Sequence, residues 1–213
     1  MADDDGGGSL RERKRLAAML RIQAVALDMF EERGFDEVTV EEIADASDVS
    51  PSSLYRYFGT KEQIVLWDQF DLDQDVLLAA GLADRVPLEG LRRIIGSSVG
   101  AMSPADEALV QRRLALVMTA PALEAAATAQ VYQVSEVIGR QLAAHLGRPE
   151  VDLEVQVFSH AFTGGLLGMV HHWYGTGFAQ PLHAVVERTF DIFEEGLDIV
   201  TAPGTVGLTP GAL

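Results

Sequence analysis

The sequence predicts an all-α protein in which a short helix-turn-helix unit precedes a larger helical bundle. Three observations support this fold class. Apolar residues recur at spacings of three and four, and no segment shows the sustained alternation of a β-strand. Pro87, Pro104 and Pro121 stand where helices can begin, because the first turn does not need their missing N–H. The segment 39–61 reads as two short helices joined by a tight turn.

Composition narrows the class of protein. The chain has 213 residues, of which 48% are apolar and 23% charged, so it can bury a sizeable core. It contains no cysteine, which excludes a disulfide framework and a thiolate metal site. No apolar run reaches the roughly 18 residues of a membrane helix. The acidic start MADDDGGGSL lacks the apolar region of a secretory signal. We therefore expect no membrane partner.

The N-terminal half contains the predicted helix-turn-helix. Residues 1–9 form a Gly- and Asp-rich tail that we expect to be flexible. A helix follows over 10–33, and Gly34 suits a C-terminal position with positive φ. Thr39 and Glu42 form a capping-box pattern before a helix over 40–46. Ser50 is a natural N-cap and Pro51 a natural first residue for a helix over 51–57.

The remainder reads as further helices. We expect them over 61–82, 87–102, 104–119, 121–146, 150–174 and 182–200, with a flexible tail over 201–213. The helix over 150–174 is apolar around most of its circumference, so it should be buried on more than one side. Small residues on one of its faces would let another helix approach closely. Together with a stripe on the last helix, they could form a four-helix interface around a two-fold axis. The interface candidates are Ala161, Gly164, Gly165, Gly168, His172, Val186, Thr189, Phe193 and Leu197.

Residues 16–66 resemble the DNA-binding domain of the tetracycline-repressor (TetR) family of bacterial transcription regulators. The matching segments are ALDMFEERGFDEVTVEEIADASDVS and LYRYFGTKEQIV. The resemblance implies a DNA-binding domain over 10–60 and an effector-binding and dimerisation domain over 61–200. It also implies a bacterial cytoplasmic homodimer of about nine helices per subunit. Its partners would be double-stranded DNA with a palindromic operator and a small-molecule effector.

Four residues match positions that contact phosphates in this family. Thr39 lies at a helix N-terminus, where a hydroxyl and free N–H groups suit a phosphate, although it could be a plain cap. Tyr55 and Tyr57 match phenolic donors, although one of them could pack under the next helix. Lys61 matches a phosphate-binding lysine and could otherwise be an ordinary surface residue.

The first turn of the second short helix is where base edges are normally reached. Ser50, Pro51, Ser52 and Ser53 occupy this turn, and serine discriminates bases weakly because it can donate or accept. Arg56 is the one residue of this helix suited to bidentate contact with guanine, although it could also face a phosphate or solvent.

The charge balance is unusual for a DNA-binding protein. The formal net charge is −16, and residues 1–70 carry 8 Lys and Arg against 15 Asp and Glu. Basic domains are the common pattern. DNA contact must therefore come from a local basic surface. Arg11, Arg13, Lys14 and Arg15 could form an arm that reaches a minor groove, or a solvated face.

The sequence defines the residues of the effector pocket less clearly than those of the DNA-binding surface. Its candidates are large apolar side chains, each of which could equally be ordinary core: Trp67, Phe70, Met102, Met118, Tyr132, Phe158, Phe162, Met169 and Trp173. His160 and His171 share a helix face, but no Asp or Glu lies four residues from either. We therefore expect no metal site and no cofactor.

Three functions remain open. The leading one is a repressor released from its operator by an inducer. The second is a regulator without an inducer, either an activator or a constitutive repressor. The third is a helical-bundle enzyme, which the sequence disfavours because it offers no nucleophile–base pair, paired carboxylates or phosphate-cradling loop. We expect a protein that is not an enzyme.

Overall fold

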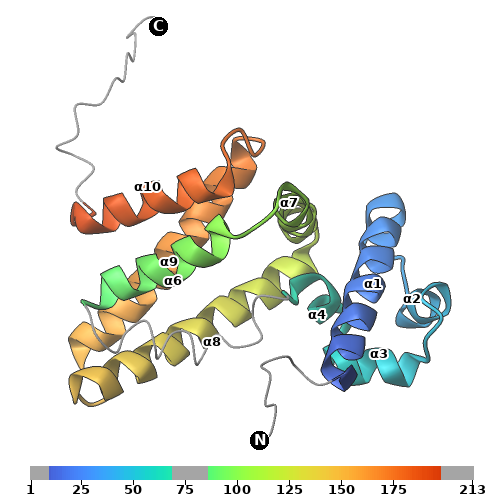
Figure 1. Cartoon of the computed structure of the whole chain (residues 1–213), viewed down its shortest axis with the longest axis horizontal. Helices are drawn as coiled ribbons and strands as arrows, with labels where there is room; N and C mark the ends of the chain where they lie inside the picture. Colours follow the sequence, from blue (N-terminus) through green and yellow to red (C-terminus); the bar gives the residue numbers. More distant parts are fainter. Residues whose placement is uncertain (1–9, 69–85, 198–213) are drawn as a thin grey trace, which may run out of the picture.

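The computed structural model describes residues 10–68 and 86–197, and this part of the chain is all-α. It forms nine helices, in two groups with α4 and α7 between them (Figure 1). Their bounds are α1 Leu10–Arg33, α2 Val40–Ala46, α3 Pro51–Phe58, α4 Lys61–Leu66, α6 Pro87–Gly100, α7 Pro104–Thr119, α8 Pro121–Leu146, α9 Leu153–Gly175 and α10 Leu182–Glu194.

Helices α1, α2 and α3 pack as the predicted helix-turn-helix unit. The α2 helix begins with a complete capping box, in which Thr39 accepts from the Glu42 N–H and Glu42 accepts from the Thr39 N–H. Gly34 ends α1 with φ of +88°, as its position predicts. Phe35 packs back on Phe30, with ring centroids 5.0 Å apart. These local features present one face of α3 outward.

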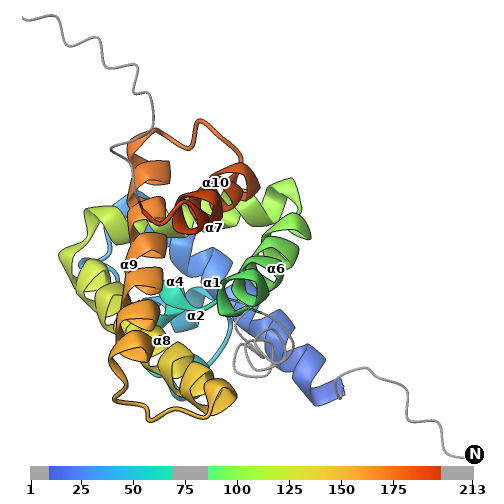
Figure 2. The same ribbon diagram turned by 90° about the vertical axis from the view of Figure 1, so that its left-hand side faces the viewer.

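The second group consists of α6, α8, α9 and α10. Helices α8 and α9 run side by side, α10 packs on α9, and α6 packs against α10 (Figures 1 and 2). Leu91, Phe162, Trp173 and Phe190 are almost completely buried in the core between these helices. The apolar character of α9 on several sides is explained by this position.

The two groups share continuous packing through α4. Ile64 and Val65 of α4 are fully buried, and they belong to the same core as α1, α2 and α3. Leu116 of α7 and Leu123 of α8 join that core as well. A movement of α4 would therefore change its contacts with both groups of helices.

Three predicted helix ends differ from the structure by three residues or more. The helix predicted over 61–82 ends at Leu66, because the Trp67 backbone is extended and its carbonyl accepts side-chain hydrogen bonds instead of continuing the helix. Residues 69–82 of this prediction lie outside the described residues. The helix predicted from 150 starts at Leu153, where the Asp152 side chain caps it. The last helix ends at Glu194, and Gly196 has φ of +78°.

The tails predicted at 1–9 and 201–213 also lie outside the described residues. In the part of the chain that the structure describes, no single helix is long and apolar enough to cross a membrane. Helices α7 and α8 meet that criterion only as a pair, and they are bent by 110° relative to each other.

Candidate DNA-binding surface and ligand cavity

The N-terminus of α3 carries a cluster of hydroxyl groups. Ser50 Oγ accepts from the Ser53 N–H at 3.2 Å and lies 3.0 Å from Ser52 Oγ and 2.9 Å from Ser53 Oγ. Ser50, Pro51 and Ser52 are exposed. These hydroxyls are satisfied by one another, but each can re-pair with a base edge or phosphate at little cost. The geometry suits an adaptable contact surface.

Arg56 lies along this surface rather than pointing away from it. Its guanidinium donates to Ser53 Oγ at 3.2 Å and lies over the Tyr57 ring, with Cζ 5.3 Å from the centroid. Tyr57 is half-buried and packs against the core, whereas Tyr55 is 48% exposed. The outward face of α3 therefore presents Tyr55 and Arg56, and Tyr57 supports Arg56 from below.

Lys61 has a fixed position at the start of α4. Its Nζ lies 4.3 Å from the centroid of the Phe35 ring and 5.7 Å from that of Phe30. A cation over an aromatic face is attracted by the ring quadrupole. The ammonium is thus held near the helix-turn-helix unit, and its stem is partly buried.

Thr39 is engaged in its capping box. Its hydroxyl donates to the Glu42 carboxylate at 2.9 Å, and Arg33 donates to the other carboxylate oxygen at 2.8 Å. The Thr39 N–H, the Arg33 side chain and the Thr39 hydroxyl lower the pKa of Glu42 to about 2. Thr39 remains exposed at the N-terminus of α2, where the first-turn N–H groups attract anions.

Arg11, Arg13, Lys14 and Arg15 project from the first turns of α1, and all four are exposed. They form a basic segment at the N-terminal end of α1, interrupted by Glu12. The structure therefore leaves the arm available for contact with nucleic acid.

A cavity of about 510 Å³ lies between α4, α6, α7, α8, α9 and α10. This volume falls in the range of sites that hold drug-sized molecules. Its lining is mainly aliphatic, and its polar side chains are Asp68, Arg113, Gln130 and Thr163.

Of the predicted pocket residues, Met118, Met169 and Trp173 line this cavity. Trp67 packs at right angles against Phe58 instead, with ring centroids 5.9 Å apart. The other predicted residues take different positions in the fold. Met102, Phe158 and Phe162 pack in the bundle core, Tyr132 is 60% exposed, and Phe70 lies outside the described residues.

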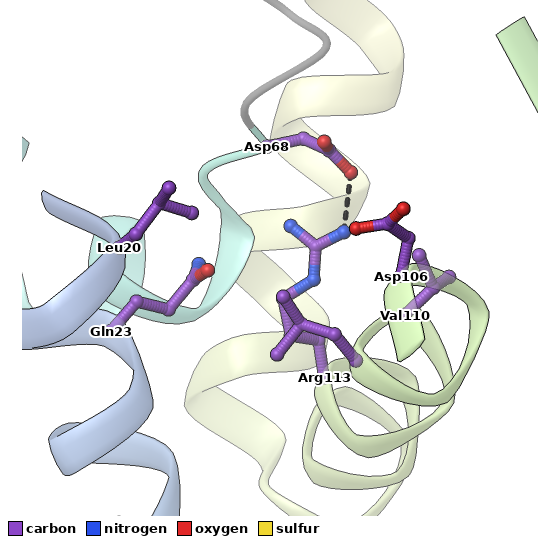
Figure 3. A pocket seen from close by; sticks show the side chains of 7 residues that line it. Leu20, Gln23, Asp68, Asp106, Val110 and Arg113 are labelled. Carbon is purple, nitrogen blue, oxygen red and sulfur yellow. Dashed lines mark hydrogen bonds and ion pairs between the residues drawn. The ribbon is translucent and has the colours of Figure 1, made fainter. Parts of the chain in front are cut away.

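The end of α4 is held by side chains from two other helices. Gln23 of α1 donates to the carbonyls of Ile64 and Trp67, both at 2.8 Å. Arg113 of α7 donates to the same Trp67 carbonyl at 2.5 Å and pairs with Asp68. Figure 3 shows this joint, where Gln23 and Arg113 approach the end of α4 from opposite sides.

Comparison with known proteins matches both groups of helices. Residues 22–66 match the model of the bacterial regulatory proteins of the TetR family, and residues 85–198 match that of the MftR C-terminal domain. The chain belongs to the TetR family. It is therefore a DNA-binding transcriptional regulator, and α3 is the second helix of its helix-turn-helix.

Two relatives span most of this TetR-family regulator. The mycofactocin biosynthesis transcriptional regulator MftR of Mycobacterium tuberculosis is 26% identical over 190 residues, covering 87% of this chain and 94% of MftR. The regulator TcmR of Streptomyces glaucescens is 30% identical over 155 residues, covering 70% of this chain and 67% of TcmR.

Solved structures show the same fold at low sequence identity. SmeT, the repressor of the Stenotrophomonas maltophilia efflux pump SmeDEF, has a TM-score of 0.57 and 19% identity, covering 92% of this chain and 96% of SmeT. SmeT has also been solved in complex with triclosan, with a TM-score of 0.58 and 18% identity over 92% of this chain and 99% of that one. NalD of Pseudomonas aeruginosa has a TM-score of 0.56 and 19% identity, covering 86% of this chain and 97% of NalD.

The dimer candidates of this TetR-family regulator separate into two sets. Ala161, Gly164, Gly168 and His172 are exposed on one face of α9. On α10, Val186 faces inward instead: it is 2% exposed and lines the cavity. Val186 therefore belongs to the core of its own subunit, whereas Thr189 and Phe193 are partly exposed.

Three of the remaining interface candidates make contacts inside their own subunit, and the fourth is exposed. The Phe193 ring covers Gly165, leaving no room for a Cβ there. The Thr189 hydroxyl donates to the Val185 carbonyl at 2.8 Å. Leu197 is 53% exposed, just after α10.

The histidines of α9 are bonded to their own helix. Nδ1 of His160 lies 2.9 Å from the Gln156 carbonyl, and Nδ1 of His171 lies 2.8 Å from the Leu167 carbonyl. Within the described ranges, no group of three His, Asp or Glu side chains could hold a metal ion.

Sequence reasoning missed the polar residues of the cavity and the joint: Gln23, Asp68, Arg113 and Gln130. Arg113 carried a usable signal, because it directly precedes the apolar segment LALVMTA in a helix that the fold must bury. Gln23 carried none, since its partners are backbone carbonyls 41 and 44 residues away.

Proposed function

We propose that this protein is a homodimeric repressor that leaves a palindromic operator when a small molecule binds in its C-terminal cavity. The observation that carries this proposal is the cavity itself. Six helices line it, and Val65, Leu66 and Asp68 at the end of α4 form part of its wall. A ligand there would contact α4, the helix that directly follows α3, and α3 is the proposed recognition helix.

The proposed mechanism needs only a difference in affinity between two conformations. Recognition helices of a dimer on DNA lie about one helical turn apart, roughly 34–36 Å. A ligand that prefers a different α4 position would favour a dimer whose recognition helices have the wrong separation. SmeT, whose fold this chain shares, has been solved in complex with the small molecule triclosan, and this supports a small-molecule ligand for this chain.

The exposed face of α9 supports the homodimer. Val157, Ala161, Gly164, Gly168 and His172 follow helical spacing on this face, and Val157 is 57% exposed. A Cβ at Gly164 or Gly168 would meet nothing within 4 Å. This face therefore suits close approach by the same helix of a second subunit.

The DNA contacts are assigned to the outward face of α3 and its surroundings. Ser50, Ser52, Tyr55 and Arg56 would reach the major groove or its flanking phosphates. Thr39, Lys61 and the basic arm would bind phosphates, and Tyr57 would hold Arg56 in place. Because the protein is acidic overall, its affinity would depend on these few contacts.

A binding assay on the DNA upstream of the chain's own gene tests the proposal. We expect the wild-type protein to bind a palindrome there, and Lys61→Ala to lower the slope of log K against log salt by about one unit, as for one lost phosphate contact. Tyr55→Phe removes a neutral donor, so it should weaken binding and leave the slope unchanged. An unchanged slope in Lys61→Ala would contradict the phosphate assignment.

The two remaining claims need separate variants. Gly164→Arg should convert the dimer to a monomer in sedimentation without altering the helical content. Val134→Trp should fill the cavity, keep DNA binding and abolish any response to small molecules. If the protein has no inducer, the wild type and Val134→Trp should bind DNA equally well in the presence of every small molecule tested. That result would overturn the sensing claim.

A further inference from the structure

Two polar atoms on residues that line the cavity have no hydrogen-bond partner among the described residues. They are Arg113 Nε, on α7, and Gln130 Oε1, on α8, and both atoms are buried. A buried polar atom without a partner is costly, and native structures contain few of them. Three such side-chain atoms occur in the part of the chain that the structure describes, and two of them belong to this cavity.

Both terminal nitrogens of the Arg113 guanidinium have hydrogen-bond partners. Nη1 donates to the Trp67 carbonyl at 2.5 Å, and Nη2 pairs with the Asp68 carboxylate. Figure 3 shows Asp68 and Asp106 both pointing toward the guanidinium. The Arg113 side chain is only 12% exposed. Nε is therefore the one nitrogen of this guanidinium without a hydrogen-bond partner among the described residues.

The two carboxylates beside Arg113 favour a ligand whose polar group is neutral. A ligand carboxylate approaching Arg113 would meet the negative charges of Asp68 and Asp106, and like charges in a poorly solvated site repel strongly. A carbonyl or hydroxyl oxygen can accept from Nε–H without that repulsion. The remaining lining is largely aliphatic, so it favours an apolar body.

We propose that Arg113 is the specificity-determining residue of the cavity: its Nε–H binds an accepting oxygen of an otherwise apolar, uncharged ligand. This inference rests on the proposed function, because it deepens the ligand site assigned there. Gln130 offers a second polar contact, since a side-chain amide can donate or accept.

Arg113 also connects the cavity to the DNA-binding helices. The Trp67 carbonyl that it binds is the one held by Gln23 of α1. The neighbouring Arg112 pairs with Asp28 and Glu31 of α1. A ligand that shifts Arg113 therefore changes the contacts at the end of α4, only a few residues after the recognition helix.

Calorimetric titration of the full chain with three matched probes tests the inference. Butylbenzene has no acceptor, butyrophenone adds a carbonyl, and 4-phenylbutyrate carries a charge. We expect butyrophenone to bind about three- to ten-fold more tightly than butylbenzene, as for one buried hydrogen bond, and 4-phenylbutyrate to bind most weakly.

Arg113→Lys is the matched variant, because lysine keeps a cation beside Asp68 but lacks the Nε–H. The variant should lose the preference for butyrophenone while its affinity for butylbenzene stays the same. Hydrogen exchange of residues 61–67 should change on adding butyrophenone to the wild type and not to the variant. Retention of the carbonyl preference in Arg113→Lys, equal binding of ketone and hydrocarbon, or tightest binding of the anion would each overturn the inference.

The outcomes separate this inference from the proposed function. If butylbenzene binds in the wild type and not in Val134→Trp, the cavity is a ligand site whatever Arg113 does. If none of the three probes binds the folded wild type, the sensing function fails and the role of Arg113 fails with it.

Discussion

Replacement of Gly165 by alanine tests how α9 and α10 close the bundle. A Cβ at Gly165 would lie 2.3 Å from Phe193 Cζ and 2.9 Å from Cε1. Carbon atoms pack at about 3.5–4.0 Å, so the ring would have to move by more than about 1 Å. Its centroid lies 5.3 Å from that of Phe162, which blocks movement inward. Overpacking of this kind costs about 1–3 kcal/mol.

The same substitution has an opposing effect on helix propensity. Alanine is favoured over glycine in a helix by about 1 kcal/mol, so the net loss in the free energy of unfolding should be about 0–2 kcal/mol. The packing contribution can be isolated in a double-mutant cycle. In Phe193→Ala, where the ring is absent, Gly165→Ala should stabilise the protein instead.

Urea unfolding at a fixed protein concentration measures this cycle. We expect a coupling energy of about 1–3 kcal/mol between the two positions. An identical effect of Gly165→Ala in both backgrounds would refute the packing of Phe193 over Gly165. It would also reopen Gly165 as a contact between subunits.

Three further predictions concern the joint, the capping box and the recognition helix. Gln23→Leu should lower the free energy of unfolding by about 1–3 kcal/mol in urea unfolding, because the Ile64 carbonyl loses its side-chain donor; an unchanged midpoint would contradict this. Because the folded-state pKa of Glu42 is depressed to about 2, its stabilising effect should be present above its ordinary pKa of 4.5 and disappear as the pH falls toward 2. The difference in urea midpoint between the wild type and Glu42→Gln should therefore shrink across that window, and a constant difference would contradict the assignment. Arg56→Ala should cost about 1–3 kcal/mol and relax the preference at one base pair, measured by competition with substituted operators; a uniform loss over all sequences would indicate a phosphate contact instead.

The fold was predictable because its signals are local. Prolines and capping residues placed the starts of α2, α3, α7 and α8, and periodic apolar residues supplied the helices between them. The early end of α4 was not predictable. It depends on Gln23 and Arg113 binding the Trp67 carbonyl, and these contacts join residues 44 and 46 positions apart.

The DNA-binding surface was more accessible to sequence reasoning than the cavity. The α3 candidates lie within one short helix, so spacing alone brings Ser52, Tyr55 and Arg56 to an exposed surface. The cavity is formed by six helices, and only tertiary packing decides which apolar side chains border it. Thus Trp173 lines the cavity and Phe162 does not, although both are large, aromatic and buried on α9.

The most direct test of the account is a fluorescence anisotropy titration of the full chain against a duplex taken from upstream of its gene, at about 0.15 M salt. We predict saturable binding to a palindrome with half-sites about 34–36 Å apart, lost on scrambling the palindrome and reversed by a ligand that fits the cavity. Equal affinity for the scrambled duplex, or no binding at this salt concentration, would contradict a sequence-specific regulator.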